Sequence, residues 1–272
     1  MSPKTVSTST DADFLRAVEQ AKLAALYNFA YGLSHEINNP LANIATRAQT
    51  LLADEKDPER RRKLATIVQQ AFKAHEMIAD LMLFAHPPRM QPRESDLVQL
   101  LDTVIGELSE QAHEQNTRLE RVGAIEPLIA NVDPTAMAVA IKALVQNALE
   151  SMQHDGTVTI GVYEFKTQDS SLKVDGPHEL GTPHSALRIP NSAERSTIFP
   201  AIVLSITDTG PGIPPGVRPY IFDPFFSGRE AGRGLGLGLS KAWRIVDLHG
   251  GRIDVESEPG HGATFRVILP VE

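Results

Sequence analysis

Apolar residues recur at helical spacing through the first third of the chain. Over about 13–52 the intervals between them alternate between three and four residues, with one shift near Ile37, and the same alternation runs over 64–85. This spacing predicts two helices with narrow apolar stripes, the second ended by Pro87 and Pro88. The stripes comprise Leu23, Leu26, Ala30, Leu33, Ile37, Leu41, Ile44, Ala48 and Leu51, then Leu64, Ile67, Ala71, Ala74, Ile78, Leu81 and Ala85.

Two helices with such narrow stripes do not bury both of them well by pairing only with each other. We therefore expect an α hairpin that forms a dimeric four-helix bundle with a second copy of the chain. Residues 13–88 form this domain in our interpretation. Residues 1–12, which are polar, are assigned to a disordered tail, and residues 89–96 to a linker.

The pattern after Pro92 mixes helical and strand periodicity, which predicts an α+β sandwich over 97–272, with helices on one face of a mixed sheet. A polar stretch at about 166–198 is interpreted as a long surface loop, and a stretch rich in Gly and Pro at about 209–234 as a second loop. Helices are expected at about 97–115, 134–152 and 235–248, and strands at about 118–122, 129–132, 157–165, 201–207, 252–257 and 263–270.

Composition narrows the class of protein. The 272 residues include 34 acidic and 26 basic side chains, for a formal net charge of −8, and no cysteine. Disulfides and thiolate metal sites are therefore excluded, and a chain that coats nucleic acid is disfavoured. The N-terminus lacks an apolar signal core, and no apolar run is long enough to span a membrane. We expect a cytoplasmic protein that does not insert into membranes.

The segment SHEINNPL carries the first candidate chemistry. His35 lies two positions after the stripe residue Leu33, so it should point away from the stripe. Glu36 can hold one imidazole nitrogen and raise the nucleophilicity of the other. Asn39 follows on the same helical face, and Pro40 should bend the helix just beyond it. The other histidines share no metal-ligand spacing, and we assign them to surfaces and turns.

Two further clusters suggest nucleotide chemistry. Asn147 sits within an apolar helix, where asparagine is a poor helix former, and its amide oxygen could bind hydrated Mg²⁺. Asp208 follows an apolar strand and precedes Gly210 and Gly212. A carboxylate at a strand end with glycines beside it suits recognition of a base amino group.

The second half of the loop at about 209–234, and the residues just after it, contain aromatic and glycine clusters. Three phenylalanines stand in FDPFF, among residues that break regular structure, and we interpret them as an aromatic latch. The segment GRGLGLGL then opens the helix expected at 235–248. Glycines at a helix start bring backbone N–H groups close to phosphates. Each motif alone is weak evidence, but their order is specific.

Together these motifs resemble the catalytic core of bacterial two-component sensor histidine kinases. SHEINNPL is similar to the phosphoacceptor box of that family, QNALES to its asparagine box, DTGPGIP and GRGLGLGL to its glycine boxes, and FDPFF to its phenylalanine box. The resemblance covers the chain from about residue 13 to its end. The HEINNP form resembles the nitrogen-regulator-like branch.

The resemblance implies a Bergerat-type ATP-binding fold and an autokinase that uses ATP and Mg²⁺. His35 would accept the γ-phosphoryl group, Glu36 would orient or deprotonate it, and Asn39 would position water when the partner is dephosphorylated. The phosphoryl group would pass to an aspartate of a response regulator receiver domain, within a homodimer controlled by a sensor domain or signalling protein.

The resemblance also assigns nucleotide contacts. Asn147, with Glu150 near it, would hold Mg²⁺, and Asp208 would bind the adenine amino group. The segment at about 209–234 would be the ATP lid, with Arg229 as a phosphate contact. The remaining lid and cofactor-binding positions are Gly210, Gly212, Phe222, Phe225, Phe226, Gly232, Gly234, Leu235, Gly236 and Leu237.

Two departures from the family pattern affect this interpretation. Many relatives carry a second asparagine one turn before the magnesium asparagine, where this chain has Ala143. Water and Glu150 would therefore supply more of the ligands of the metal ion. The chain also shows no sensor domain, so it is either a fragment of a larger kinase or a kinase driven by a separate protein.

Other classes of protein share the implied fold. Gyrase-like ATPases need a carboxylate at the position of Ala143 to activate water, and they lack the His35 hairpin, so a hydrolase fits poorly. A related serine/threonine kinase would not need His35. The remaining alternative is a phosphatase-dominant switch or a nucleotide-sensing scaffold with weak autokinase activity.

Overall fold

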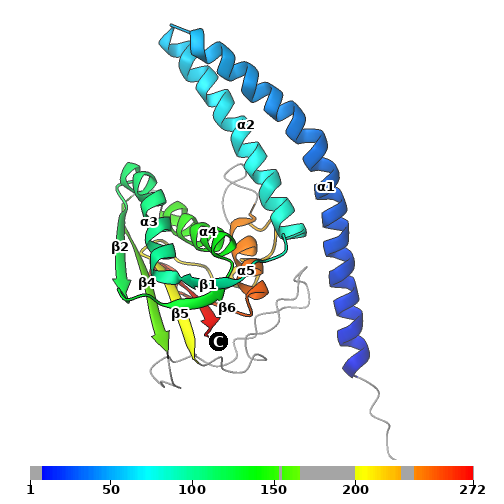
Figure 1. The fold of residues 1–272 in the computed structure, drawn as a ribbon, viewed down its shortest axis with the longest axis vertical. Coiled ribbons are helices and arrows are strands. Elements are labelled where there is room, and N and C mark those ends of the chain that lie inside the picture. Colours follow the sequence, from blue (N-terminus) through cyan, green and yellow to red (C-terminus); the bar gives the residue numbers. More distant parts are fainter. Residues whose placement is uncertain (1–7, 153–154, 166–199, 228–235, 272) are drawn as a thin grey trace, which may run out of the picture. The chain divides into compact units, whose positions relative to one another are not determined.

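The computed structural model describes residues 8–152, 155–165, 200–227 and 236–271. Contacts divide the chain into two compact units, Met1–Pro88 and Arg89–Glu272 (Figure 1). The described helices are α1 (Thr8–Asp54), α2 (Pro58–Ala85), α3 (Leu97–Glu114), α4 (Pro134–Met152), α5 (Gly238–Leu248) and the short 3₁₀ helix η2 (Arg218–Tyr220). The strands are β1 (Arg93–Asp96), β2 (Arg118–Gly123), β3 (Ile129–Val132), β4 (Thr157–Phe165), β5 (Ala201–Asp208), β6 (Arg252–Ser257) and β7 (Ala263–Pro270).

The first unit is a helical hairpin. Helix α1 begins at Thr8, so the assignment of residues 8–12 to a disordered tail is wrong, because these residues continue the helix toward the N-terminus. A short turn leads to α2, where the Asp57 carboxylate accepts a hydrogen bond from the N–H of Arg60 and caps the helix. Helix α2 ends at Ala85, just before the two prolines.

The hairpin buries small residues where its two helices meet. Ala45 and Ala48 of α1 and Ala71 of α2 are buried. By contrast, three residues of the apolar stripe of α1, spaced seven apart, are exposed to solvent. Ile37, Ile44 and Leu51 are 37%, 48% and 62% exposed. The α hairpin is confirmed, but much of its predicted apolar stripe does not face its own second helix.

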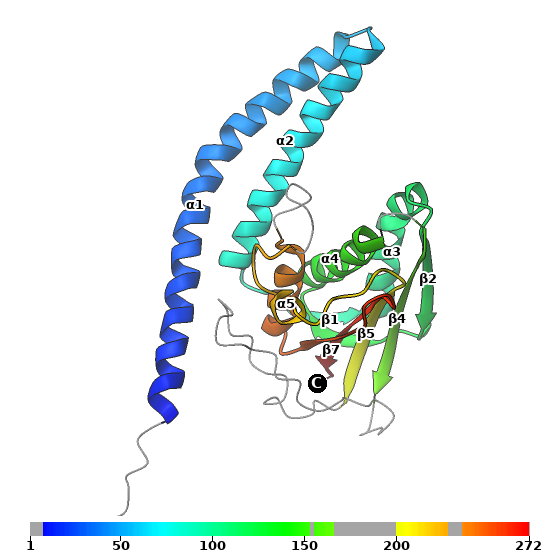
Figure 2. The same ribbon diagram turned by 180° about the vertical axis from the view of Figure 1, so that it is seen from behind.

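The second unit is a sheet covered on one face by helices, as predicted (Figure 2). Its five strands run in the order β2-β4-β5-β7-β6, with β2 parallel to β4 and the other pairs antiparallel. Helices α3, α4 and α5 pack on this face and contact one another through α4. The residues of the central strands and of α4 that face this layer are fully buried, including Leu144, Ile160, Leu204 and Phe265.

A second, two-stranded sheet joins β1 to β3 in antiparallel register, with Arg93 opposite Val132. The expectation that residues 89–96 are a linker is therefore wrong for its second half. Residues 93–96 pair with β3, and Asp96 caps α3 by accepting a hydrogen bond from the N–H of Val98. These contacts make β1 part of the second unit.

Candidate functional site

The predicted phosphoacceptor residues lie in the middle of α1. The side chain of His35 is outside the described part of the structure, while those of Glu36 and Asn39 are exposed. The helix continues through Pro40, and Figure 1 shows that it is curved along its length. Proline lacks the N–H that would bond to the carbonyl of Glu36, so this turn of the helix has one hydrogen bond fewer than its neighbours.

A contact between the two helices of the hairpin lies close to this turn. The imidazole Nδ1 of His75, on α2, is 2.9 Å from the amide oxygen of Asn38, on α1. His75 is exposed, as predicted for a surface histidine, but its ring also contacts α1. No sequence signal could have paired these two side chains, because their contact depends on how the helices are registered against each other.

In the second unit, Asp208 ends β5 and is 3% exposed. Its carboxylate accepts a hydrogen bond of 2.8 Å from the N–H of Gly210 and a further bond from the N–H of Ala263, and it lies beside the hydroxyl of Ser151, which donates to the carbonyl of Ala148. Burial raises the pKa of Asp208, and these hydrogen bonds offset the rise only in part. The site thus holds a buried acceptor at the end of a strand.

The predicted magnesium residue belongs to the helix beside this carboxylate. Asn147 is half-buried on α4, and Ser151 follows one turn later on the same face of the helix. Because the hydroxyl of Ser151 and the carboxylate of Asp208 lie side by side next to Gly210, the asparagine box and the first glycine box meet at this point. Glu150 is exposed, whereas Ala143 is 6% exposed and packs in the core.

The loop that follows Asp208 and contains Gly210 and Gly212 packs against the turn between β6 and β7. Gly212 has φ of +72°, and a Cβ there would lie 2.1 Å from the carbonyl oxygen of Glu258. Ser257 accepts a hydrogen bond from the N–H of Ile213 and donates one to the carbonyl of Gly262. Gly212 is therefore required for the approach of these two backbone segments, in addition to any role near a ligand.

The three phenylalanines of FDPFF have different surroundings. Phe222 packs edge to face against buried Phe265 of β7, with ring centroids 6.4 Å apart. Phe226 packs against Tyr220 at 6.1 Å. Phe225 is 47% exposed and adopts φ of +66°, which non-glycine residues rarely do. Two of the three rings thus hold this segment in place, and one faces outward.

The second glycine box joins the phenylalanine box through the backbone. The N–H of Phe225 donates to the carbonyl of Gly236, and Gly236 has φ of +67° with no room for a side chain beside Phe226. Leu237 is buried. Helix α5 begins at Gly238, three residues later than the sequence suggested, because the left-handed Gly236 cannot belong to a helix.

Other predicted positions cannot be placed. Arg229, Gly232, Gly234 and Leu235 lie outside the described residues, as does the loop expected at 166–198. Among the described residues, the structure has no group of three or more histidine, aspartate or glutamate side chains suited to hold a metal ion. A magnesium ion bound with a triphosphate would take its protein oxygen from the amide of Asn147, which lies on the same helical face as Ser151 beside Asp208.

A hydrogen-bond network surrounds Asp133, which precedes α4 and caps its N-terminus. Its carboxylate accepts hydrogen bonds from the N–H groups of Gln91, Thr135 and Ala136, and its own N–H donates to Nε2 of His249. Burial acts to raise the pKa of Asp133, but these hydrogen bonds and the nearby His249 together lower it. The network attaches the chain at Gln91 to α4 and α5.

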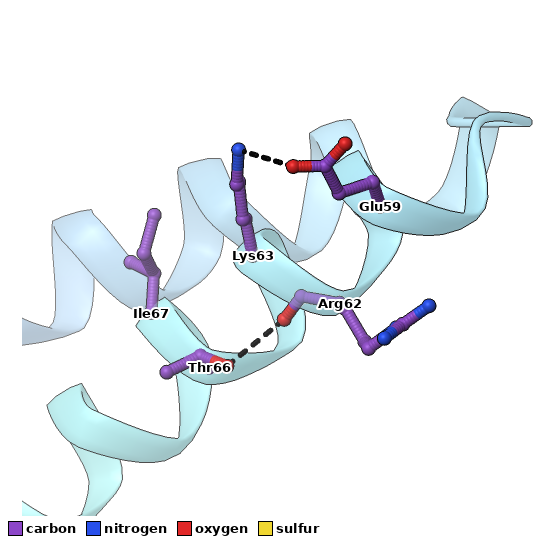
Figure 3. Close-up of a pocket in the computed structure, with 5 residues that line it drawn as sticks. All are labelled: Glu59, Arg62, Lys63, Thr66 and Ile67. Atoms are coloured by element: carbon purple, nitrogen blue, oxygen red, sulfur yellow. Dashed lines mark hydrogen bonds and ion pairs between the residues drawn. The ribbon is translucent and has the colours of Figure 1, made fainter.

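A shallow pocket on α2 contains none of the predicted site residues. Figure 3 shows its lining of Glu59, Arg62, Lys63, Thr66 and Ile67, all on one helix. Lys63 pairs with Glu59 at 2.8 Å, and Thr66 donates to the carbonyl of Arg62. These pairings engage the side chains of Glu59, Lys63 and Thr66, and Ile67, 44% exposed, is the apolar member of the lining.

Within the described residues, none of the helices is both long enough and apolar enough to cross a bilayer. Two families match the chain. The His Kinase A (phospho-acceptor) domain matches residues 25–88, and the histidine kinase-, DNA gyrase B- and HSP90-like ATPase domain matches residues 181–272. The first match contains SHEINNPL, and the second contains both glycine boxes and FDPFF.

Individual proteins show the same similarity. The sensory histidine kinase/phosphatase NtrB of Vibrio alginolyticus is 31% identical over 88% of this chain and 61% of its own length. Full-length ShkA in complex with AMPPNP superposes with a TM-score of 0.66 at 22% identity, over 90% of this chain and 46% of that one. The histidine kinase ThkA in complex with the response regulator TrrA gives 0.60 at 21% identity, over 99% of this chain and 68% of that one.

The likeness to the two solved structures concerns the fold alone. The curated relatives are longer proteins, of which this chain spans between 25% and 65%. The two matched domains follow each other in the order that the sequence motifs predicted, and NtrB recurs among the curated relatives. The chain therefore carries a histidine kinase phosphoacceptor domain followed by an ATP-binding domain, the arrangement of a two-component kinase core, and NtrB-type sensor kinases are among its relatives.

Proposed function

We propose that this chain is an ATP-dependent protein histidine kinase that phosphorylates His35 and passes the phosphoryl group to an aspartate of a response regulator. The observation that carries the proposal is the buried carboxylate of Asp208 beside the asparagine box, in a chain that also presents SHEINNPL on a helical hairpin. Neither a simple ATPase nor a simple helical scaffold needs both features.

Asp208 is the proposed adenine-binding residue. A carboxylate with little exposure can accept a hydrogen bond from an exocyclic amino group, and low exposure strengthens that bond. The N–H groups of Gly210 and Ala263 hold the carboxylate in one orientation before the base arrives. Adenine carries the required amino group, whereas guanine presents a carbonyl at the same position.

Asn147 is the proposed magnesium ligand, with Glu150 near the same metal. The amide oxygen of Asn147 lies one helical turn from Ser151 and thus on the side of α4 that faces Asp208. Bound Mg²⁺ would neutralise charge on the triphosphate. Because Ala143 supplies no ligand and is buried, water would complete more of the coordination shell.

The segment between Phe222 and Leu237 is the proposed base of an ATP lid. Phe222 and Phe226 anchor one end, and Gly236 joins the other end to it through the hydrogen bond from Phe225. Arg229, Gly232, Gly234 and Leu235 are proposed lid contacts on their sequence positions alone. An anchored base with a glycine hinge would let the intervening residues close over the phosphates.

Phosphoryl transfer to His35 requires alignment more than covalent help from the protein. An imidazole nitrogen of His35 attacks the γ-phosphorus, the bond to the bridging oxygen breaks, and ADP leaves. Glu36 accepts the proton on the other imidazole nitrogen, so that the imidazole donates electrons more readily. The phosphohistidine then gives its phosphoryl group to the receiver aspartate.

A homodimer is the proposed assembly. Ile37, Ile44 and Leu51 form an exposed stripe with a seven-residue period on α1, and Ile67 and Phe72 are exposed on α2. Leaving these large side chains in water is unfavourable, while a second copy would cover them in a four-helix bundle. A sensor domain or signalling protein would act on this bundle, in the cytoplasm where ATP is available.

A phosphatase-dominant switch is the second candidate. NtrB carries both activities in its name, and Asn39 is exposed one turn beyond His35, where it could position water against a phosphorylated regulator. This candidate uses the same hairpin and the same ATP-binding domain. It differs in predicting little label on His35 and rapid loss of phosphate from the receiver aspartate.

The test is incubation of the dimeric chain with γ-labelled Mg-ATP, in parallel with His35→Gln and Asn147→Asp. We expect acid-labile, alkali-stable label on the parent chain and none on either variant. Label that persists on His35→Gln would place the acceptor elsewhere. ATP binding without label, together with release of phosphate from a phosphorylated regulator that depends on Asn39, would favour the phosphatase-dominant switch.

A further inference from the structure

The hydrogen bond between His75 and Asn38 joins the two helices of the hairpin beside the phosphoacceptor box. The atoms Nδ1 and Oδ1 are 2.9 Å apart, and the residues are separated by 37 positions. Both side chains lie near water rather than in the core, as His75 is exposed and Asn38 half-buried. The bond is therefore not part of a buried core. Its position beside the phosphoacceptor box suggests a role other than packing.

The bond lies in the turn of α1 that is interrupted by Pro40. Asn38 stands three residues after His35, about 4.5 Å along the helix axis, and two residues before Pro40. Because Pro40 has no N–H, the carbonyl of Glu36 lacks its usual partner within the helix. The bond from His75 thus attaches α2 to the one turn of α1 that has lost a backbone hydrogen bond and that lies directly after the phosphoacceptor.

The chemistry of the pair makes the attachment robust. An amide oxygen only accepts hydrogen bonds, so Nδ1 of His75 must carry a proton. Both the imidazolium and one neutral tautomer satisfy this, and in the other tautomer the amide of Asn38 can turn and donate to Nδ1. The contact is therefore available in every protonation state of His75.

We propose that His75 is a positioning residue for His35. By holding the turn that contains Asn38 against α2, it fixes the direction in which α1 presents the phosphoacceptor imidazole. Transfer in line with the γ-phosphate depends steeply on such alignment. This inference rests on the proposed kinase function, since it assigns the contact a role in that reaction.

The experiment compares His75→Ala, His75→Gln, Asn38→Ala and the double alanine variant with the parent chain, with Lys73→Ala as an exposed control on the same helix. Initial rates of label incorporation are measured over a range of Mg-ATP concentrations. We expect His75→Ala to lower the maximal rate by about fivefold with an unchanged KM for ATP. His75→Gln, whose amide can donate to Asn38, should recover most of the rate, and the double variant should be no slower than either single one.

Two results would overturn the inference: equal maximal rates for the parent and His75→Ala, or a double variant whose losses multiply. Hydrogen exchange of the amides over 34–44 is measured on the same proteins and does not depend on activity. Faster exchange in His75→Ala, but not in Lys73→Ala, is the expected result, and unchanged exchange contradicts the attachment. If the parent takes up no label while this exchange result holds, the kinase proposal fails and the cross-helix attachment stands.

Discussion

The two units of the chain differ in how completely they bury their large apolar side chains. In the second unit, Leu144, Leu204 and Phe265 are fully buried by the unit's own sheet and helices. In the hairpin, Ala48 and Ala71 are buried, as are Leu81 and Phe84 near the end of α2, but Ile44 and Leu51 remain about half exposed or more. The described part of the second unit thus buries its own core, whereas the described part of the hairpin leaves large apolar side chains exposed.

This contrast corresponds to two tasks. A nucleotide site needs fixed groups, and in the proposed site the carboxylate of Asp208 is held by the N–H groups of Gly210 and Ala263 within a packed core. A phosphoacceptor must instead be reached by an ATP-binding domain and then by a regulator, so it lies on an exposed helix. The predictions below test whether the difference in burial separates the two units as sharply as the structure suggests.

The largest effect is expected at the exposed stripe of the hairpin. Ile44→Asp would place an unpaired charge in the proposed dimer core, at a cost of several kcal/mol for each copy, and should raise the dimer dissociation constant by about a hundredfold or more. Gln49→Asp adds the same charge at an exposed position off the stripe and should leave the dimer intact. Sedimentation velocity over a concentration series measures both. A dimer that withstands Ile44→Asp would show that the stripe is not the interface.

The next effect concerns the closed core of the second unit. Leu144→Ala removes a fully buried side chain from α4 and should lower the free energy of unfolding by about 3 kcal/mol. Leu248→Ala, at a position 40% exposed on α5, should change it by about 0.5 kcal/mol or less. Urea unfolding followed by circular dichroism gives both values. Similar losses for the two variants would mean that the core of this unit is less tightly packed than its burial indicates.

The nucleotide site should respond to Asp208→Ala. Loss of a hydrogen bond to a charged acceptor is worth about 1.5–3 kcal/mol, so the dissociation constant of ATP should rise by about ten- to a hundredfold. Asp102→Ala, which removes an exposed carboxylate on α3, is the matched control and should bind ATP as the parent does. Isothermal titration calorimetry measures each constant. Unchanged affinity in Asp208→Ala would remove this residue from the adenine site.

The pH dependence of binding should differ from that of folding. The pKa of Asp208 is raised, so its carboxylate takes up a proton at a higher pH than an ordinary aspartate, and ATP affinity should fall as pH drops through that raised value. The pKa of Asp133 is lowered, so its contribution to stability is present above the ordinary aspartate value and is lost only as pH falls through the lowered one. Titrations of affinity and of stability should therefore show binding lost first. Simultaneous loss of both would contradict the separate roles of these two acids.

The sequence was informative where structure depends on local pattern and uninformative where it depends on contact between distant elements. Strand β4 and the end of α2 at Ala85 could be predicted, because alternation and paired prolines are local signals. The start of α5 at Gly238 could not, since the left-handed Gly236 is imposed by the backbone of the phenylalanine box. The pairing of His75 with Asn38 likewise follows from the register of two helices.

The candidate site shows the same division. The motifs identified Asp208 and Asn147 as separate hypotheses, but the position of Ser151, on the helix of Asn147 and beside Asp208, could not be predicted before the fold was known. The three phenylalanines were predicted to act together as a latch. The structure distinguishes them, because Phe222 reaches the buried ring of Phe265 while Phe225 faces outward.

The smallest expected effect lies at the tip of the hairpin, where stability depends on local hydrogen bonds rather than on burial. The carboxylate of Asp57 accepts a bond of 2.8 Å from the N–H of Arg60 at the start of α2. Asp57→Ala should cost about 1 kcal/mol, and Asp57→Ser, which keeps an acceptor, should cost less than half of that. Thermal unfolding of the dimer measures both. Equal losses would indicate that the negative charge of Asp57 beside the helix N-terminus, and not its hydrogen bond, stabilises the turn, because only the charge is absent from both variants.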